Sequence, residues 1–120
     1  MANYKLIVFT DPVPGKEDEY NDWYNNVHLR DVVAVPGFVS AQRFKLEAAI
    51  IGELPNRYLA IYEMETDGDP AKLMELVGQR SGTEAMIVSD AIDLNANNVG
   101  IFKPCSEVVR APDVAAAEQS

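Results

Sequence analysis

Apolar positions follow two different periods along the 120-residue chain. Runs rich in β-branched and aromatic residues predict four strands, at residues 4–10, 38–46, 57–65 and 99–103. Apolar residues spaced three and four apart predict two helices, one over residues 16–34 and one from residue 70 to residue 78 or 82. The predicted order of elements is therefore β-α-β-β-α-β.

This order is the split βαβ pattern of the ferredoxin-like fold, an α+β fold with a four-stranded antiparallel sheet and both helices on one face. Right-handed crossovers make the first and third strands the central pair. The strands are apolar on both sides, so the sheet face opposite the helices needs a cover. A second copy of the chain is the natural cover, and the pattern predicts a homodimer through sheet-to-sheet packing. We expect one domain over residues 1–108 and a flexible C-terminal tail over residues 109–120.

The predicted first helix carries a carboxylate within its apolar stripe. An α-helical period places these residues on the stripe and its margins: Tyr20, Trp23, Tyr24, Val27, Asp31, Ala34 and Val35. His28, the only histidine, lies three residues before Asp31 on the adjoining edge. His28 is a candidate general acid or base, with Asp31 holding its tautomer. The alternative is a structural pair that hydrogen-bonds together with Arg43 beneath the helix.

Three further groups of residues have both a functional and a structural interpretation. Arg43 projects from an otherwise apolar strand face, either to anchor an anionic substrate or to form an ion pair, with Asp31 as one partner. Trp23, Tyr24 and Tyr62 either line a pocket for an aromatic ligand or belong to the core. The apolar segment 85–88 lies outside the six predicted elements, and it either forms a pocket wall with Met86 touching the ligand or packs over the second helix.

Charge and motifs exclude several classes of function. Ten basic and nineteen acidic residues give a net charge of −9, which argues against binding to nucleic acid or to an anionic membrane surface. The single cysteine, Cys105, has no partner for an internal disulfide and no histidine near it. The chain has no phosphate-binding loop and no metal-ligand motif, so we predict no cofactor and no metal. It has no signal peptide and no membrane span, which predicts a soluble, cytoplasmic protein.

The residues of the first helix and the strand after it resemble a known family. Residues 19–28, Asp31-Val32, Pro36-Gly37-Phe38 and residues 41–44 are similar to the EthD-like branch of the dimeric α+β barrel superfamily. The resemblance implies a homodimer, a pocket between sheet and helices in each subunit, and a role for His28 as the family's helix histidine facing that pocket. This chain has Arg30 where the family pattern has a proline. Haem is not implied, because the only histidine lies in the EthD-like motif.

Together these observations predict a small cofactor-free enzyme that acts on an apolar, aromatic or ketone-bearing metabolite through proton transfer by His28. The reaction class remains open between isomerase, lyase and monooxygenase. The alternative is a non-catalytic protein of the same fold that binds a small organic ligand or serves as an accessory protein. The predicted catalytic residues are His28 and Asp31, and the predicted ligand contacts are Trp23, Tyr24, Arg43, Tyr62 and Met86.

Overall fold

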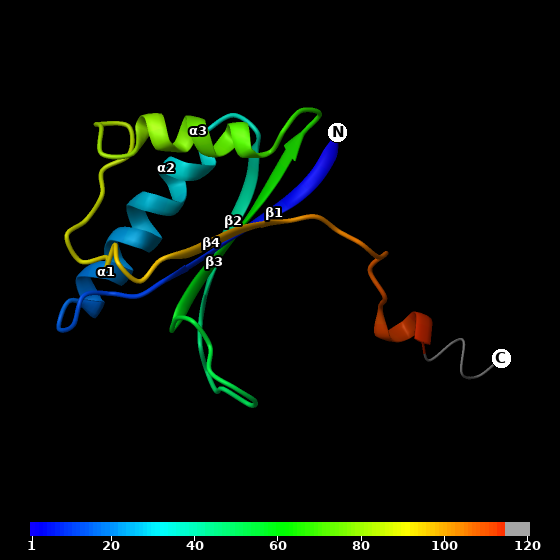
Figure 1. The fold of residues 1–120 in the computed structure, drawn as a ribbon, viewed down its shortest axis with the longest axis horizontal. Helices are drawn as coiled ribbons and strands as arrows, with labels where there is room; N and C mark the ends of the chain where they lie inside the picture. Colours follow the sequence, from blue (N-terminus) through cyan, green and yellow to red (C-terminus); the bar gives the residue numbers. More distant parts are fainter. Residues whose placement is uncertain (115–120) are drawn as a thin grey trace.

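The computed structural model describes residues 1–114 of the chain. Its strands and helices are β1 (Ala2–Thr10), α1 (Glu17–Trp23), η1 (Tyr24–His28), α2 (Leu29–Val33), β2 (Phe38–Lys45), β3 (Tyr58–Thr66), α3 (Ala71–Arg80) and β4 (Asn98–Phe102) (Figure 1). The segments α1, η1 and α2 follow one another without a break and together form the predicted first helix. The predicted order of four strands and two helices is thus confirmed.

The four strands form one antiparallel sheet in the order β2-β3-β1-β4. The central pair is β1 and β3, with Leu6 opposite Tyr62, as the crossover rule predicts. The helices α1, α2 and α3 lie on the same side of the strands (Figure 1). Along β3 the side chains of Tyr58, Ala60, Tyr62 and Met64 are buried beneath this helical layer. The ferredoxin-like α+β fold is confirmed.

A bulge at the start of β2 changes which residues face the helices. The pairing with β3 shifts between Phe38, which lies opposite Met64, and Ser40, which lies opposite Glu63. One extra residue moves every later side chain to the other face of the sheet. Phe38 is therefore in the core, while Phe44 is 43% exposed on the opposite face. The alternation of a regular strand over residues 38–46 predicts both phenylalanines on one face, and the bulge makes this prediction wrong.

The first helix contains a π-helical turn that moves its buried face by one residue. The turn is η1, where the backbone hydrogen bonds join residues five apart instead of the four apart of an α-helix. After it, Val32 and Val35 are buried. The sequence period placed Asp31 and Ala34 on the apolar stripe. In the structure, Asp31 is partly buried and Ala34 is exposed. Asp31 thus lies beside the buried face rather than within it, which corrects its predicted position.

The segment between α3 and β4 adds to the core. Met86 and Ala91 are fully buried, and Ile92 forms an isolated bridge with Pro12. The indole Nε1 of Trp23 donates a hydrogen bond of 2.9 Å to the carbonyl oxygen of Ile87. This bond fixes the segment to α1, on the helical side of the sheet.

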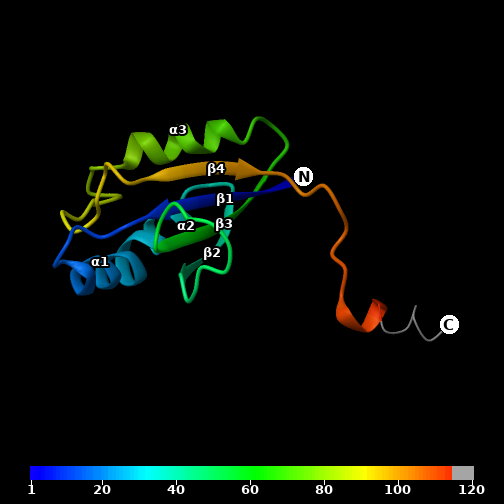
Figure 2. The same ribbon diagram turned by 60° about the horizontal axis from the view of Figure 1, so that its bottom comes forward.

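The chain leaves the sheet after β4. Residues 103–114 are exposed and run away from the rest of the molecule, with a helical turn at residues 111–114 (Figures 1 and 2). The predicted domain boundary at residue 108 stays a prediction, and residues 115–120 of the predicted tail lie outside the described residues. Within residues 1–114, no helix is both long and apolar enough to cross a membrane.

Candidate functional site

Most of the residues predicted for the site lie around the ring of Tyr24, which is 1% exposed. Its ring centroid is 5.3 Å from that of Trp23 and 5.0 Å from that of His28. The hydroxyl of Tyr62 donates a hydrogen bond of 3.4 Å to the Tyr24 hydroxyl. The guanidinium carbon of Arg43 lies 4.4 Å from the Tyr24 centroid. We call this group the Tyr24 cluster: Tyr20, Trp23, Tyr24, His28, Arg43 and Tyr62.

Three elements bring the cluster together. The first helix supplies Tyr24 and His28, which share a face because they are four residues apart, and the π turn also brings His28 onto Trp23, five residues earlier. Arg43 lies opposite Ala60 in the β2–β3 pairing, so its side chain shares the helix-facing side of the sheet with Tyr62. Tertiary pairing therefore builds the site from residues far apart in the chain.

Arg43 is held by amides and aromatic rings. Its Nη1 donates a hydrogen bond of 2.7 Å to Asn25 Oδ1, and its Nη2 donates one of 3.0 Å to Asn21 Oδ1. The guanidinium also packs over the rings of Tyr20 and Tyr58, at 5.0 and 5.2 Å. Its Nε is buried without a hydrogen-bond partner. None of the ion pairs found within residues 1–114 includes Arg43, so the predicted alternative of an ion pair with Asp31 is not formed.

His28 packs against aromatic rings and makes no hydrogen bond to Asp31. Its ring stacks on Trp23, with centroids 4.6 Å apart and an interplanar angle of 23°. Its Nδ1 is buried without a partner among the described residues. Burial lowers the pKa of His28 to about 4, although the charge of Asp31 acts in the opposite direction. The predicted His28–Asp31 hydrogen bond is wrong because the π turn rotates His28 into the aromatic layer.

The remaining predicted ligand contacts belong to the buried core. The exposed fractions are 8% for Trp23, 1% for Tyr62 and 0% for Met86. Burial raises the pKa of the Tyr24 hydroxyl, and it raises the pKa of the Tyr62 hydroxyl well above the usual range. Both phenols are thus neutral hydrogen-bonding groups at pH 7. Contact of these side chains with a ligand stays a prediction.

A groove runs between the first helix and β2 beside the cluster. It has a volume of about 620 Å³ and opens to solvent. We call it the helix–β2 groove, and its lining is Asn25, Leu29, Arg30, Val33, Ala34, Ser40 and Ala41. The lining is mainly aliphatic, with polar groups at intervals. Apart from Arg30, which the family resemblance singled out, sequence reasoning did not assign these residues to a site, because their contact requires the helix to lie against β2.

A polar hollow of about 400 Å³ meets this groove at Asn25, which lines both. Its lining is Glu17, Asp18, Asn21, Asn25, Arg43, Phe44, Lys45 and Tyr58. Asn21 and Asn25 are one helical turn apart, and this spacing beside two buried tyrosines was a signal available in the sequence. The hollow and the groove together form a continuous surface with one polar part and one apolar part.

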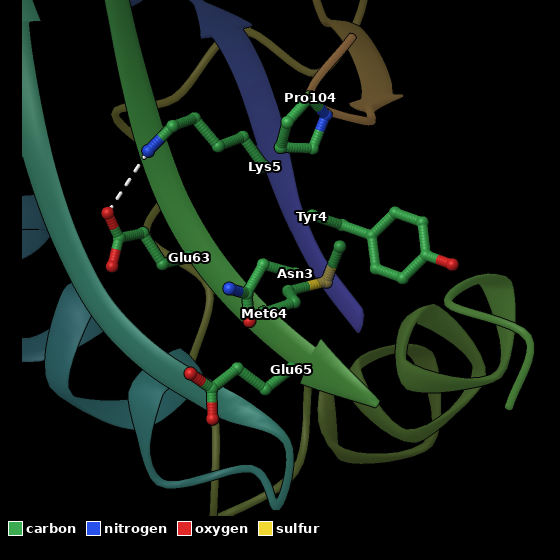
Figure 3. Close-up of a pocket in the computed structure, with 7 residues that line it drawn as sticks. All are labelled: Asn3, Tyr4, Lys5, Glu63, Met64, Glu65 and Pro104. Atoms are coloured by element: carbon green, nitrogen blue, oxygen red, sulfur yellow. Dashed lines mark hydrogen bonds and ion pairs between the residues drawn. The ribbon is translucent and has the colours of Figure 1, made fainter. Parts of the chain in front are cut away.

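A smaller pocket of about 210 Å³ lies toward the other end of β3, near Pro104 (Figure 3). Lys5 Nζ and Glu63 Oε1 form an ion pair of 3.0 Å at this pocket (Figure 3). The Lys5 ammonium holds the pKa of Glu63 below its usual range. Because each side chain is about half exposed, the pair contributes little to stability and its charges satisfy each other. The other charged side chain of this pocket, Glu65, is in no ion pair within residues 1–114, and the pocket is smaller than the usual ligand site of about 300–1,000 Å³, so we do not assign the site to it.

Comparison with solved structures identifies three of the same fold. A candidate monooxygenase from Shewanella loihica PV-4 is 17% identical over 92% of this chain and 97% of its own, with a TM-score of 0.55. An EthD family protein from Bacillus halodurans C-125 is 16% identical over 87% and 99%, with a TM-score of 0.55. A point variant of MhuD with two manganese protoporphyrin IX molecules per active site is 16% identical over 89% and 99%, with a TM-score of 0.57. The resemblance to the EthD-like branch is thus confirmed as a likeness of fold.

No family model and no curated protein sequence matches this chain. The porphyrin in the MhuD variant raises the question of whether the residues of this chain fit haem. The only histidine, His28, has its ring packed against Trp23 and Tyr24 and its Nδ1 buried. Residues 1–114 also contain no cluster of three acidic, histidine or cysteine side chains that could hold a metal ion. These residues do not fit a haem held by an axial histidine.

Proposed function

We propose that this chain binds a small, mainly apolar organic molecule in the helix–β2 groove. The observation that carries the proposal is the groove itself, with a volume of about 620 Å³ and aliphatic side chains such as Leu29, Val33 and Ala41 on its walls. Ligand sites commonly have volumes of about 300–1,000 Å³ and combine apolar walls with a few polar groups. The proposal includes no cofactor.

Filling the groove tests this proposal. The Ala41→Phe variant places a ring in the groove, whereas Gln79→Phe adds the same ring to the exposed surface of α3. Purified protein is incubated with a mixed metabolite extract, and the retained molecules are identified by mass spectrometry. We expect the wild-type chain and Gln79→Phe to retain the same molecule and Ala41→Phe to lose it. Equal retention by all three proteins contradicts the assignment of the groove.

A second candidate is a cofactor-free enzyme in which His28 transfers a proton. Its support is the buried, unpartnered Nδ1 of His28, because buried polar groups without a partner are rare outside functional sites. With a pKa of about 4, the imidazole is neutral at pH 7, which leaves one ring nitrogen without a proton but makes it a weak base. Leu29, the next residue, lines the groove, whereas His28 itself faces Trp23 and Tyr24. Asp31 acts on His28 only through its charge.

Turnover of the retained molecule separates the two candidates. His28→Ala abolishes turnover and keeps ligand binding if the imidazole transfers the proton. Val27→Ala, a truncation at the neighbouring exposed position, serves as the control. Isomerisation, lyase chemistry and oxygenation are all assayed, since one structural neighbour is described as a candidate monooxygenase. Binding without any turnover favours the non-catalytic protein.

The proposal includes a homodimer formed by the sheet face opposite the helices. This open face carries apolar side chains from all four strands: Ile7, Phe9, Phe44, Leu59, Ile61 and Phe102. Phe44 is 43% exposed and Phe102 is 54% exposed in the single chain. An apolar face of this extent is typical of a surface that packs against another protein. Packing of two such faces would cover both at once.

A further inference from the structure

Arg43 carries a positive charge and forms no ion pair within residues 1–114, although Glu17 and Asp18 line the same hollow. The chain as a whole has nineteen acidic residues against ten basic ones. Its direct contacts are with the faces of Tyr20, Tyr24 and Tyr58 and with two asparagine oxygens, where the guanidinium of Arg43 is the group in contact. The guanidinium is therefore fixed in position, and no ion pair neutralises its charge. An arginine in this setting is suited to binding an anion.

The donors around Arg43 form a fork that remains partly free. Nη1 and Nη2 each donate one hydrogen bond, to Asn25 and Asn21, and each has a second N–H. The side-chain amide nitrogen of Asn25 makes no hydrogen bond among the described residues, and Asn25 stands where the polar hollow meets the helix–β2 groove. These N–H groups can donate hydrogen bonds to one planar anionic group at the polar end of the groove.

The carboxylates of the hollow select against a doubly charged anion. Glu17 is already engaged, since its oxygens lie 3.1 Å from Arg57 Nη1, 4.0 Å from Lys45 Nζ and 2.8 Å from the Tyr58 hydroxyl. Asp18 lines the hollow without such partners among the described residues. Its negative charge repels a dianion such as phosphate more strongly than a monoanion. A carboxylate therefore fits the hollow better than a phosphate.

We propose that the ligand of this site is an amphipathic carboxylic acid, with its carboxylate on Arg43 and Asn25 and its apolar body in the helix–β2 groove. The proposal rests on the proposed function and adds the chemical class of the ligand. The apolar body lies along Leu29, Val33 and Ala41, which continue from Asn25 along the groove. Charge and shape thus match a molecule that is anionic at one end only.

A matched pair of probes tests the charged end. The full chain is titrated by calorimetry at pH 7.5 with 4-phenylbutanoate and with 4-phenylbutan-1-ol, which share the apolar body and differ in the terminal group. We expect the carboxylate to bind about tenfold more tightly than the alcohol, as for a charge-assisted hydrogen-bonded contact. If both probes bind equally, the proposed groove stands and the carboxylate inference is overturned. If neither binds, both are overturned.

Three variants test whether Arg43 causes the preference for the carboxylate probe over the alcohol probe. Arg43→Gln is expected to bind both probes equally, because it removes the charge and the fork. Asn25→Asp places a carboxylate beside Arg43 on the exposed helix surface, and we expect the same loss of preference even if Arg43→Gln is poorly folded. Lys72→Gln removes an exposed cation from α3, outside the lining of the groove and the hollow, and is expected to keep the tenfold preference. Retention of the preference in both Arg43→Gln and Asn25→Asp contradicts the assignment to Arg43.

Discussion

The guanidinium carbon of Arg43 lies 4.4 Å from the centroid of the Tyr24 ring, so a strand-borne cation rests on a helix-borne aromatic face. His28 packs edge-on against the same ring, at 5.0 Å between centroids. Tyr24 therefore separates the two polar groups of the candidate site and positions both. Contacts of this kind hold the first helix against β2, and their removal has measurable consequences.

Arg43→Lys should destabilise the fold although it keeps the charge. A lysine ammonium cannot reproduce the two fixed hydrogen bonds to Asn25 and Asn21 or stack on the tyrosine rings. We expect the free energy of unfolding to fall by about 1–2 kcal/mol, measured by urea denaturation. Arg30→Lys on the exposed helix surface is the control and should change it by less than about 0.5 kcal/mol. Equal stability of both variants contradicts a structural role for the fork.

Deletion of Asn26 should be tolerated. Asn26 is an exposed residue of the π turn, and its side chain bonds only to Asp22 within the described residues. Removing one residue from a π turn restores an α-helix and keeps Tyr24 and Val32 on one face. We expect a loss of less than about 1 kcal/mol in the free energy of unfolding.

The control is deletion of Glu75, an exposed residue in α3, which has no π turn to absorb the change. This deletion rotates the later apolar residues of α3, Leu76 and Val77, away from the sheet. We expect it to cost about 2 kcal/mol or more. Similar losses for the two deletions would show that the π turn does not account for the shifted face of the first helix.

His28 should make the fold less stable at acidic pH. Its pKa is about 4 in the folded chain and 6.5 in the unfolded chain, so the unfolded state binds more protons between these values. The stability that the neutral imidazole contributes is present above pH 6.5 and is lost as the pH falls toward 4. The free energy of unfolding decreases by about 3 kcal/mol over this range. The measurement is the free energy of unfolding at pH 7 and pH 4.5 for the wild type and for His28→Phe, which keeps a ring to stack on Trp23. An identical pH dependence in both proteins would mean that His28 titrates normally.

The open sheet face should mediate dimerisation. Ile61 lies on β3 with its side chain on this face, and Ile61→Glu places a charge in the middle of the proposed interface. Light scattering at micromolar concentration should give a dimer for the wild type and a monomer for Ile61→Glu. Val27→Glu, at an exposed position on the helical side, should remain dimeric. A stable wild-type monomer contradicts the homodimer.

The protein should not bind nucleic acid at physiological salt. A net charge of −9 offers no release of counterions from a phosphate backbone. We expect no gel shift with duplex DNA or RNA and no retention on heparin at ~150 mM salt. A shift at this ionic strength would point to a basic surface that forms only in an assembly.

The sequence alone determined the order of elements and the architecture. Strand and helix periods depend on neighbouring residues, and for this reason β1, β3 and both helices lie within a few residues of their predicted positions. The crossover rule then left one arrangement, with β1 and β3 at the centre of the sheet. The same local patterns singled out Tyr24, His28 and Arg43 as unusual residues, and the structure brings these three together.

Only the tertiary structure decided which side chains meet at the site. Two single-residue irregularities, the π turn of η1 and the bulge after Phe38, each displace a face by one position. A fixed period cannot reveal either, because packing against the rest of the fold stabilises them. The π turn directs His28 toward Trp23 rather than Asp31, and the bulge places Arg43 on the helix-facing side of the sheet. The partners of Arg43 lie on another element, 18 and 22 residues earlier, and such contacts form only when the helix docks on β2.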